Sequence, residues 1–202
     1  MRAPAPTVVA FDLMDTLVRD PFREALRAAT GRPLRELFTL RDADVYPAFE
    51  RGEIDEATYW ASYPEVGIDV DPDRFHAVRR RETRWLPGMR ELLVEVRDAG
   101  TTVVVASNYP HWLVEHADGM LAGLVDDVVG SFELGARKPD AVFYERLCAR
   151  LGADPVEVAF VDDRDVNLEG AGDVGLRPVP AGEAEQVRAE LRRVGVPVSA
   201  AG

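Results

Sequence analysis

The stretch TVVAFDLMDTL at positions 7–17 decides the fold. Residues 7–11 form a short, β-branched apolar run, which is typical of a parallel strand buried on both faces. Asp12 comes directly after this run, and Thr16 follows it in a predicted tight turn. A carboxylate held there can attack a phosphoryl group or a halide-bearing carbon and form a covalent ester. Taken alone, the stretch also fits an aspartate that only stabilises a turn.

Later apolar runs repeat this pattern and alternate with amphipathic segments of helical length. The runs are TTVVVA (101–106), DDVVGS (126–131), VEVAFV (156–161) and LRPVP (176–180), and the helical segments are 87–99, 110–121 and 139–151. Such alternation indicates an α/β fold with a doubly wound parallel sheet. Ligands of that fold bind beyond the carboxyl ends of the strands, where Asp12 lies.

One region interrupts the alternation. Residues 19–84 read as helical and strandless, and they separate the first strand from the second by much more than one crossover helix. We therefore predict two units: a core of residues 1–18 and 85–202, and a small helical cap of residues 19–84 over the strand ends. Trp60 and Trp85 are predicted to pack between them.

Ser107 and Asn108 follow the second apolar run and precede the helix expected from Pro110. A hydroxyl beside the backbone N–H groups of a helix N-terminus can bind an anion such as phosphate. A serine that only caps the helix would look the same. Together with Asp12, the pair predicts a phosphate contact.

Lys138 stands directly before Pro139, at the start of a predicted helix. A cation there opposes the helix dipole by roughly 0.3–1 kcal/mol, so a nearby anion should compensate it. We expect Lys138 to neutralise charge in the site, with Arg137 a less certain neighbour.

Asp162 and Asp163 end the fourth apolar run. Two adjacent carboxylates near Asp12 repel each other, and a hard divalent cation removes that cost. Oxygen ligands are those that Mg²⁺ prefers, so the three aspartates predict a Mg²⁺ site, with Asn167 as a possible outer ligand.

The charge and composition exclude several classes of partner. A formal net charge of -12 repels nucleic acid and anionic lipid. The single cysteine, Cys148, cannot form an internal disulfide. MRAPAP at 1–6 carries no apolar signal segment, and no run approaches membrane-spanning length, so we expect a cytoplasmic protein with no membrane partner.

The motifs, in this order, resemble those of the haloacid dehalogenase-like (HAD) hydrolase superfamily. FDLMDTL (11–17) is similar to its first motif, ASN (106–108) to its second, GARKPD (135–140) to its third and FVDDRDVNLEGAGDVGL (160–176) to its fourth. FERGEIDEATYW (49–60) and LPGMRELL (86–93) resemble stretches of its cap-bearing members. The resemblance implies a Rossmann-like core, with Asp12 as nucleophile and Lys138 as the catalytic cation.

The chain departs from the family at position 14. The resemblance implies an aspartate there, acting as general acid and then general base, but the residue is Met14. Its backbone carbonyl could still bind Mg²⁺, while its thioether cannot move a proton. Losing this help should slow release of an alkoxide by about 10²–10⁴-fold. Asp15 and His111 are possible substitutes, although a turn-stabilising Asp15 and a surface His111 fit as well.

The resulting hypothesis is a Mg²⁺-dependent phosphatase of a small phosphorylated metabolite. Asp12, Met14, Asp162 and Asp163 would hold the metal, and Thr16, Ser107, Asn108 and Arg19 would bind substrate. Asp20 is expected at the pocket mouth, and Arg41, Arg51 and Tyr59 are possible cap contributors. One alternative is a binding or regulatory module with weak or no turnover. A dehalogenase is the other, although such enzymes typically lack the acidic pair that Asp162 and Asp163 form.

Overall fold

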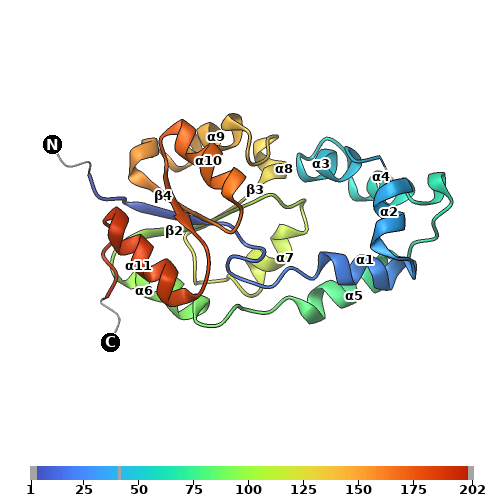
Figure 1. The fold of residues 1–202 in the computed structure, drawn as a ribbon, viewed down its shortest axis with the longest axis horizontal. Coiled ribbons are helices and arrows are strands. Elements are labelled where there is room, and N and C mark those ends of the chain that lie inside the picture. Colours follow the sequence, from blue (N-terminus) through green and yellow to red (C-terminus); the bar gives the residue numbers. More distant parts are fainter. Residues whose placement is uncertain (1–3, 41, 200–202) are drawn as a thin grey trace.

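The computed structural model describes residues 4–40 and 42–199, so the start of MRAPAP, Arg41 and residues 200–202 lie outside the described residues. Its centre is a five-stranded parallel sheet in the order β3-β2-β1-β4-β5 (Figure 1). The strands are β1 (Val8–Phe11), β2 (Thr102–Ser107), β3 (Asp127–Gly130), β4 (Val158–Asp162) and β5 (Arg177–Pro180). Each predicted apolar run holds one strand, and the predicted fold class is confirmed.

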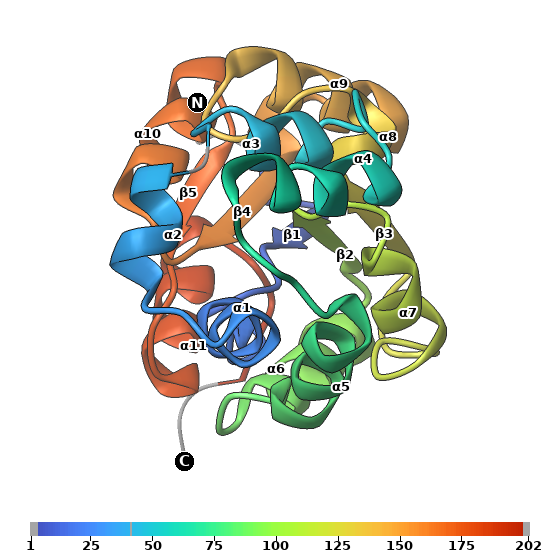
Figure 2. The ribbon, with the colours of Figure 1, turned by 90° about the vertical axis from the view of Figure 1, so that its right-hand side faces the viewer.

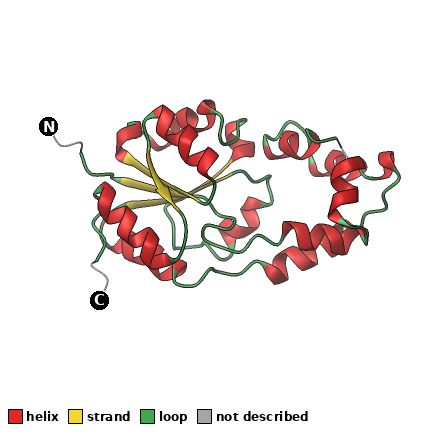
Figure 3. Cartoon of the chain, in the orientation of Figure 1, coloured by secondary structure: helices red, strands yellow, loops and turns green. Residues whose placement is uncertain are grey.

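Helices cover both faces of the sheet (Figure 3). They are α6 (Met89–Asp98), α7 (Leu113–Asp118), α8 (Ser131–Leu134), α9 (Ala141–Leu151), α10 (Asp165–Val174) and α11 (Ala184–Val194). Val9 and Phe11 of β1 join one buried cluster, and Val8 and Ala10 join another. Burial on both faces explains why the run is continuously apolar instead of alternating.

The helix predicted over 110–121 is shorter in the structure, where α7 spans only Leu113–Asp118. It ends because Gly119 leaves the helical conformation, with φ of -103° and ψ of -103°. Turns follow, closed by bonds from the Ala122 N–H to the Gly119 carbonyl and from the Leu124 N–H to the Leu121 carbonyl.

The segment between β1 and β2 is helical, as predicted for the cap. It contains α1 (Phe22–Thr30), α2 (Leu34–Leu40), α3 (Val45–Glu50), α4 (Glu56–Ala61), a 3₁₀ turn (Pro64–Val66) and α5 (Pro72–Glu82). Viewed from the cap, α3 and α4 lie on one side and α1 and α5 on the other, with β1 behind them (Figure 2).

Two paired connections join this segment to the sheet. Val18 and Trp85 form an antiparallel bridge. On either side of it, the Arg19 N–H donates to the Arg84 carbonyl and the Leu86 N–H to the Leu17 carbonyl, both at 2.9 Å. The pairing lies where the sequence predicts the cap to begin and end, at 19 and 84, and these boundaries stay a prediction.

An aromatic cluster closes the seam between cap and core. Trp112, which precedes α7, lies 5.0 Å from Phe49, 5.9 Å from Trp60 and 5.1 Å from Phe75 between ring centroids. Trp60 thus packs between cap and core as predicted, and Trp85 packs at the connection between them. Among the described helices, none has the length and apolar character needed to cross a membrane.

Candidate active site

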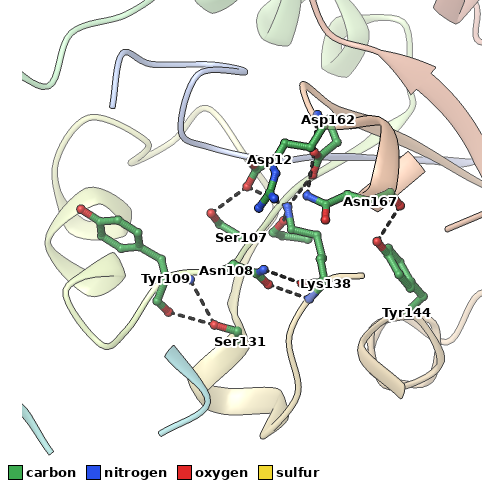
Figure 4. Close-up of polar contacts among 11 residues, drawn as sticks. Asp12, Ser107, Asn108, Tyr109, Ser131, Lys138, Tyr144, Asp162 and Asn167 are labelled. Atoms are coloured by element: carbon green, nitrogen blue, oxygen red, sulfur yellow. Dashed lines mark hydrogen bonds and ion pairs between the residues drawn. The ribbon is translucent and has the colours of Figure 1, made fainter. Parts of the chain in front are cut away.

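The register of the sheet brings the polar strand ends together. Phe11 of β1 pairs with Val105 of β2 and Val161 of β4, so the residues that follow these three reach the same edge. Asp12 lies there, 7% exposed. The Ser107 hydroxyl donates to Asp12 Oδ1 at 2.7 Å, and Lys138 Nζ lies 2.9 Å from the same oxygen (Figure 4).

Lys138 is buried between two carboxylates. Its Nζ lies 2.7 Å from Asp162 Oδ2 and 3.3 Å from the Ala106 carbonyl. The Asn108 side chain holds the backbone of this lysine from both sides. Its Nδ2 donates to the Lys138 carbonyl at 2.9 Å, and its Oδ1 accepts from the Lys138 N–H at 2.8 Å. Asn108 therefore fixes the backbone at Lys138. Both residues also line a cavity at the strand ends.

Burial and charge act in opposite directions on this pair. Burial raises the pKa of the Asp12 carboxyl, which Lys138 and the Ser107 hydroxyl lower, and the net direction is upward. Burial lowers the pKa of the Lys138 ammonium, but Asp12 and Asp162 more than offset this and raise it. The lysine therefore stays charged between its two carboxylates.

Asp12, Asp162 and Asp163 form an acidic cluster, in which one carboxylate oxygen from each residue lies within 4.8 Å of the other two. Asp162 is already bonded at both oxygens: Oδ2 pairs with Lys138, and Oδ1 accepts from the Arg164 N–H and from Asn167 Nδ2. Asp163 is the exposed member. Partial desolvation of its carboxyl, with repulsion from Asp12 and Asp162, raises its pKa to about 6. A cation would relieve that repulsion.

Asn167, the predicted outer ligand, contacts the acidic cluster through Asp162. Its Nδ2 donates to Asp162 at 2.8 Å, and its carbonyl accepts from the Tyr144 hydroxyl at 2.6 Å. Its Oδ1 is buried with no hydrogen-bond partner among the described residues. The side chain thus helps to hold Asp162 in place.

The turn after Asp12 explains the role of Asp15. Its φ is 55°, a left-handed conformation that aspartate tolerates better than most residues. Its Oδ1 accepts from the Asp20 N–H at 2.9 Å, and its own N–H donates to the Val18 carbonyl at 2.6 Å. Asp15 thus stabilises the turn, which is one of the two roles considered for it. Met14 lines a cavity together with Asp12 and Lys138.

Two predicted substrate ligands lie apart from the cavity lining. Arg19 is half-exposed and pairs with Glu24 at 2.6 Å and Glu82 at 3.3 Å, so the cap connection occupies its guanidinium. Thr16 is fully buried beneath the turn, and its Oγ1 has no hydrogen-bond partner in the described part of the chain. This arrangement does not support a direct substrate contact by either residue.

Other candidates also lie elsewhere. His111 is half-exposed and pairs with Glu56 at 3.2 Å, and Arg51 pairs with Glu53 at 2.7 Å. Tyr59 is fully buried and stacks on the Phe49 ring, with centroids 4.8 Å apart. Asp20 does line the cavity, as expected.

One residue had no predicted role. Glu50, at the end of α3, lines the same cavity of about 160 Å³ as Asp12 and Lys138. It is 5% exposed, its Oε2 lies 2.7 Å from Arg137 Nη2, and its carbonyl accepts from the Ser131 hydroxyl at 2.5 Å. Burial raises its pKa to about 7. The only sequence signal was its place in FERGEIDEATYW, a stretch similar to those of cap-bearing proteins.

Comparisons with known proteins agree with this geometry. The family model described as haloacid dehalogenase-like hydrolase matches residues 6–175. The chain is 31% identical over 193 residues to flavin mononucleotide hydrolase 1 of Arabidopsis thaliana, covering 95% of this chain and 79% of that protein. It is 29% identical over 171 residues to the sesquiterpene phosphatase astK of Aspergillus oryzae, covering 80% and 84%.

A solved structure shares the fold. It is a HAD family enzyme from Bacteroides thetaiotaomicron carrying an Asp-to-Ala substitution, in complex with magnesium and inorganic phosphate. The TM-score is 0.72 at 21% sequence identity, over 88% of this chain and 96% of that one.

Proposed function

We propose that this chain, which belongs to the haloacid dehalogenase-like hydrolases, is a magnesium-dependent phosphatase working through an aspartyl phosphate on Asp12. The observation that carries the proposal is the buried Asp12 carboxylate, 2.9 Å from Lys138 Nζ and beside two further aspartates. A carboxylate, a cation and an acidic cluster at one strand edge suit transfer of a dianionic phosphoryl group.

The reaction has two displacements. An Asp12 oxygen forms a bond to phosphorus while the ester P–O bond breaks, and the leaving oxygen takes up a proton. Water then attacks the aspartyl phosphate, the P–O bond to Asp12 breaks, and inorganic phosphate leaves. Lys138 and the Ser107 hydroxyl are placed to hold the phosphoryl oxygens, since both already contact Asp12 Oδ1.

The acidic cluster fits a magnesium ion. Its donors are hard carboxylate oxygens, and their unrelieved repulsion contributes to the raised pKa of Asp163. We propose that Asp12, Asp163 and the Met14 carbonyl hold the ion directly. Asp162, already bonded at both oxygens, would chiefly orient the cluster and Lys138. When bound, Mg²⁺ would neutralise charge on the transferring phosphoryl group.

The proposed substrate is a small phosphorylated metabolite. The Arabidopsis relative is named for hydrolysis of flavin mononucleotide and the Aspergillus relative for a sesquiterpene phosphate, and both are phosphate esters of compact organic molecules. The cavity of about 160 Å³ has room for a phosphoryl head, so the organic part must extend towards the cap. The cytoplasmic location and the exclusion of nucleic-acid partners stay predictions.

Two further hypotheses remain from the sequence. Met14 is compatible with dehalogenase chemistry, because a halide leaves without a proton, but such a reaction has no use for the acidic cluster. A binding module without turnover would keep the cavity and bind phosphate alone.

The test compares an activated aryl phosphate with a simple alkyl phosphate, with and without Mg²⁺. We expect Mg²⁺-dependent release of phosphate that Asp12→Asn reduces by at least about 10⁴-fold while the fold is retained. Asp173→Asn, an exposed aspartate on α10, is the matched control and should leave turnover unchanged. Retained activity in Asp12→Asn would overturn the mechanism. No turnover of either ester would favour the binding module, and halide release from a 2-haloacid without metal would favour a dehalogenase.

A further inference from the structure

A phosphatase with methionine at position 14 needs another source for the proton of the leaving group. We propose that Glu50 of the cap is the general acid and base that replaces the missing carboxyl at Met14. This inference rests on the proposed phosphatase function.

The first argument is position. Glu50 belongs to the cap, yet its side chain lines the cavity that also contains Asp12, Met14 and Lys138. Two contacts to the core fix it there: the Ser131 hydroxyl donates to its carbonyl at 2.5 Å, and Arg137 Nη2 lies 2.7 Å from Oε2. Arg137 adjoins Lys138 in the chain, so the cap carboxyl is held beside the phosphoryl-binding loop.

The second argument is the direction of the reaction. Attacking and leaving oxygens lie roughly in line on opposite sides of phosphorus. Asp12 attacks from the strand edge of the core, so the leaving oxygen faces away from the sheet, towards the cap. A proton donor must therefore reach into the cavity from the cap side, as the side chain of Glu50 does.

The other carboxyls of the cavity have different partners. Asp15 Oδ1 accepts from the Asp20 N–H and so closes the turn. Asp20 Oδ1 accepts from the Phe22 N–H at 2.8 Å, where α1 begins. Asp163 belongs to the acidic cluster with Asp12. Asp20 is the closest rival, because burial raises its pKa as well.

The charges around Glu50 suit a group that gives and regains a proton. Burial raises its pKa, and the charge of Asp12 adds to this, while Arg137 and Lys138 lower it, giving about 7. Tyr46, one turn earlier on α3, is half-buried. Desolvation raises the pKa of its hydroxyl well above the usual value, so it carries no charge near neutral pH. A group that titrates near neutral pH can act as acid in one step and as base in the next.

The proton balance closes over the two displacements. As the ester P–O bond breaks, its electron pair goes to the leaving oxygen, which takes the Glu50 proton and departs as an alcohol. Glu50 is then a carboxylate, and the Arg137 guanidinium beside it stabilises its negative charge. When water attacks the aspartyl phosphate, Glu50 accepts a proton from that water and is restored to its acid form.

The test uses Glu50→Gln with the aryl and alkyl phosphates. An activated aryl group leaves without a proton, so its kcat should change little, whereas kcat for the alkyl ester should fall by about 10²–10⁴-fold. In the native protein, alkyl turnover is expected to fall at high pH as Glu50 ionises, and this fall should disappear in the variant. An equal fall for both esters would mean that Glu50 only positions Arg137 or the cap, and no fall would exclude any role. Either result overturns the proposal.

Two comparisons sharpen the test. Glu53→Gln, on the same cap turn and exposed, is the matched control and should leave both esters unaffected. Asp20→Asn should not produce the selective alkyl loss, and if it does, Asp20 is the acid.

Rescue separates proton transfer from structure. Met14→Asp added to Glu50→Gln should restore alkyl turnover, because it returns a carboxyl to position 14. A structural defect at Glu50 would not be rescued in this way, so absence of rescue counts against the proposal. If the native protein turns over neither ester, the proposed function itself fails. If it hydrolyses the aryl ester but Glu50→Gln is not selective, only this inference fails.

Discussion

The floor and the roof of the cavity are built in different ways. The floor, made of Asp12, Ser107, Lys138 and Asp162, comes from strand ends and a loop of the core, and its members bond to one another. The roof comes from the cap and includes Glu50, whose ion pair with Arg137 crosses from cap to core. The contacts within the floor join core residues only. The contacts of Glu50 with Arg137 and Ser131 require the cap to lie against the core.

The largest expected effect tests the floor. Lys138→Met leaves Asp12 and Asp162 buried without their shared cation, and removing one partner of a buried pair costs about 3–5 kcal/mol. We expect a loss of that size in the free energy of unfolding measured in urea. Arg150→Met removes the exposed pairs with Asp127 and Glu133 and should cost no more than about 1 kcal/mol. Equal losses in the two variants would show that the floor is not a tightly coupled unit.

The next effect tests the roof through pH. The pKa of Glu50 is raised from 4.5 to about 7, so between these values the folded protein binds a proton that the unfolded chain releases. Stability from this group is full below pH 4.5 and is lost as pH rises through 7, by about 3 kcal/mol at about 1.4 kcal/mol per unit. Relative to Glu50→Gln, the native protein should therefore lose stability over this range. Parallel pH profiles for the two proteins would contradict the raised pKa.

The smallest effect tests how closely the roof is seated. Gly52, with φ of 70°, follows α3, and a Cβ there would lie 2.9 Å from the Phe132 carbonyl oxygen. Gly67, with φ of 75°, has no atom within 4 Å of such a Cβ in the described structure. Alanine should cost about 1–2 kcal/mol at both sites through the backbone. Only Gly52→Ala should also raise KM, because it lifts the cap from the core.

If Gly67→Ala raises KM as much as Gly52→Ala does, the contact with Phe132 is not what seats the cap. Denaturation in urea, run beside the kinetics, separates the shared backbone cost from the effect on the seam.

The same contrast explains what could be predicted from the sequence. Asp12, Ser107, Asp162 and Asp163 each follow an apolar run, and parallel pairing brings such ends to one edge, so local pattern was sufficient for the floor. Lys138 was predicted from a local electrostatic conflict at a helix start, and its two carboxylate partners resolve that conflict.

The roof could not be predicted in this way. Glu50 contacts Ser131 and Arg137 only because helices of the cap pack against a part of the core that is distant in the sequence. The spacing of apolar residues along the chain does not indicate such a contact. The surroundings of Arg19 differ from the expected ones for a related reason. Its position just past the first motif suggested the cavity, but Glu24 and Glu82 hold it at the cap connection.

The aromatic seam has an optical consequence. The chain has three tryptophans, and two of them, Trp60 of the cap and Trp112 of the core, lie stacked at an interplanar angle of 23°. Separating the two bodies would expose both indoles to water and shift their emission to longer wavelength. Tryptophan fluorescence would therefore report any separation of cap and core, and rapid mixing with a phosphate analogue could follow it without a dye.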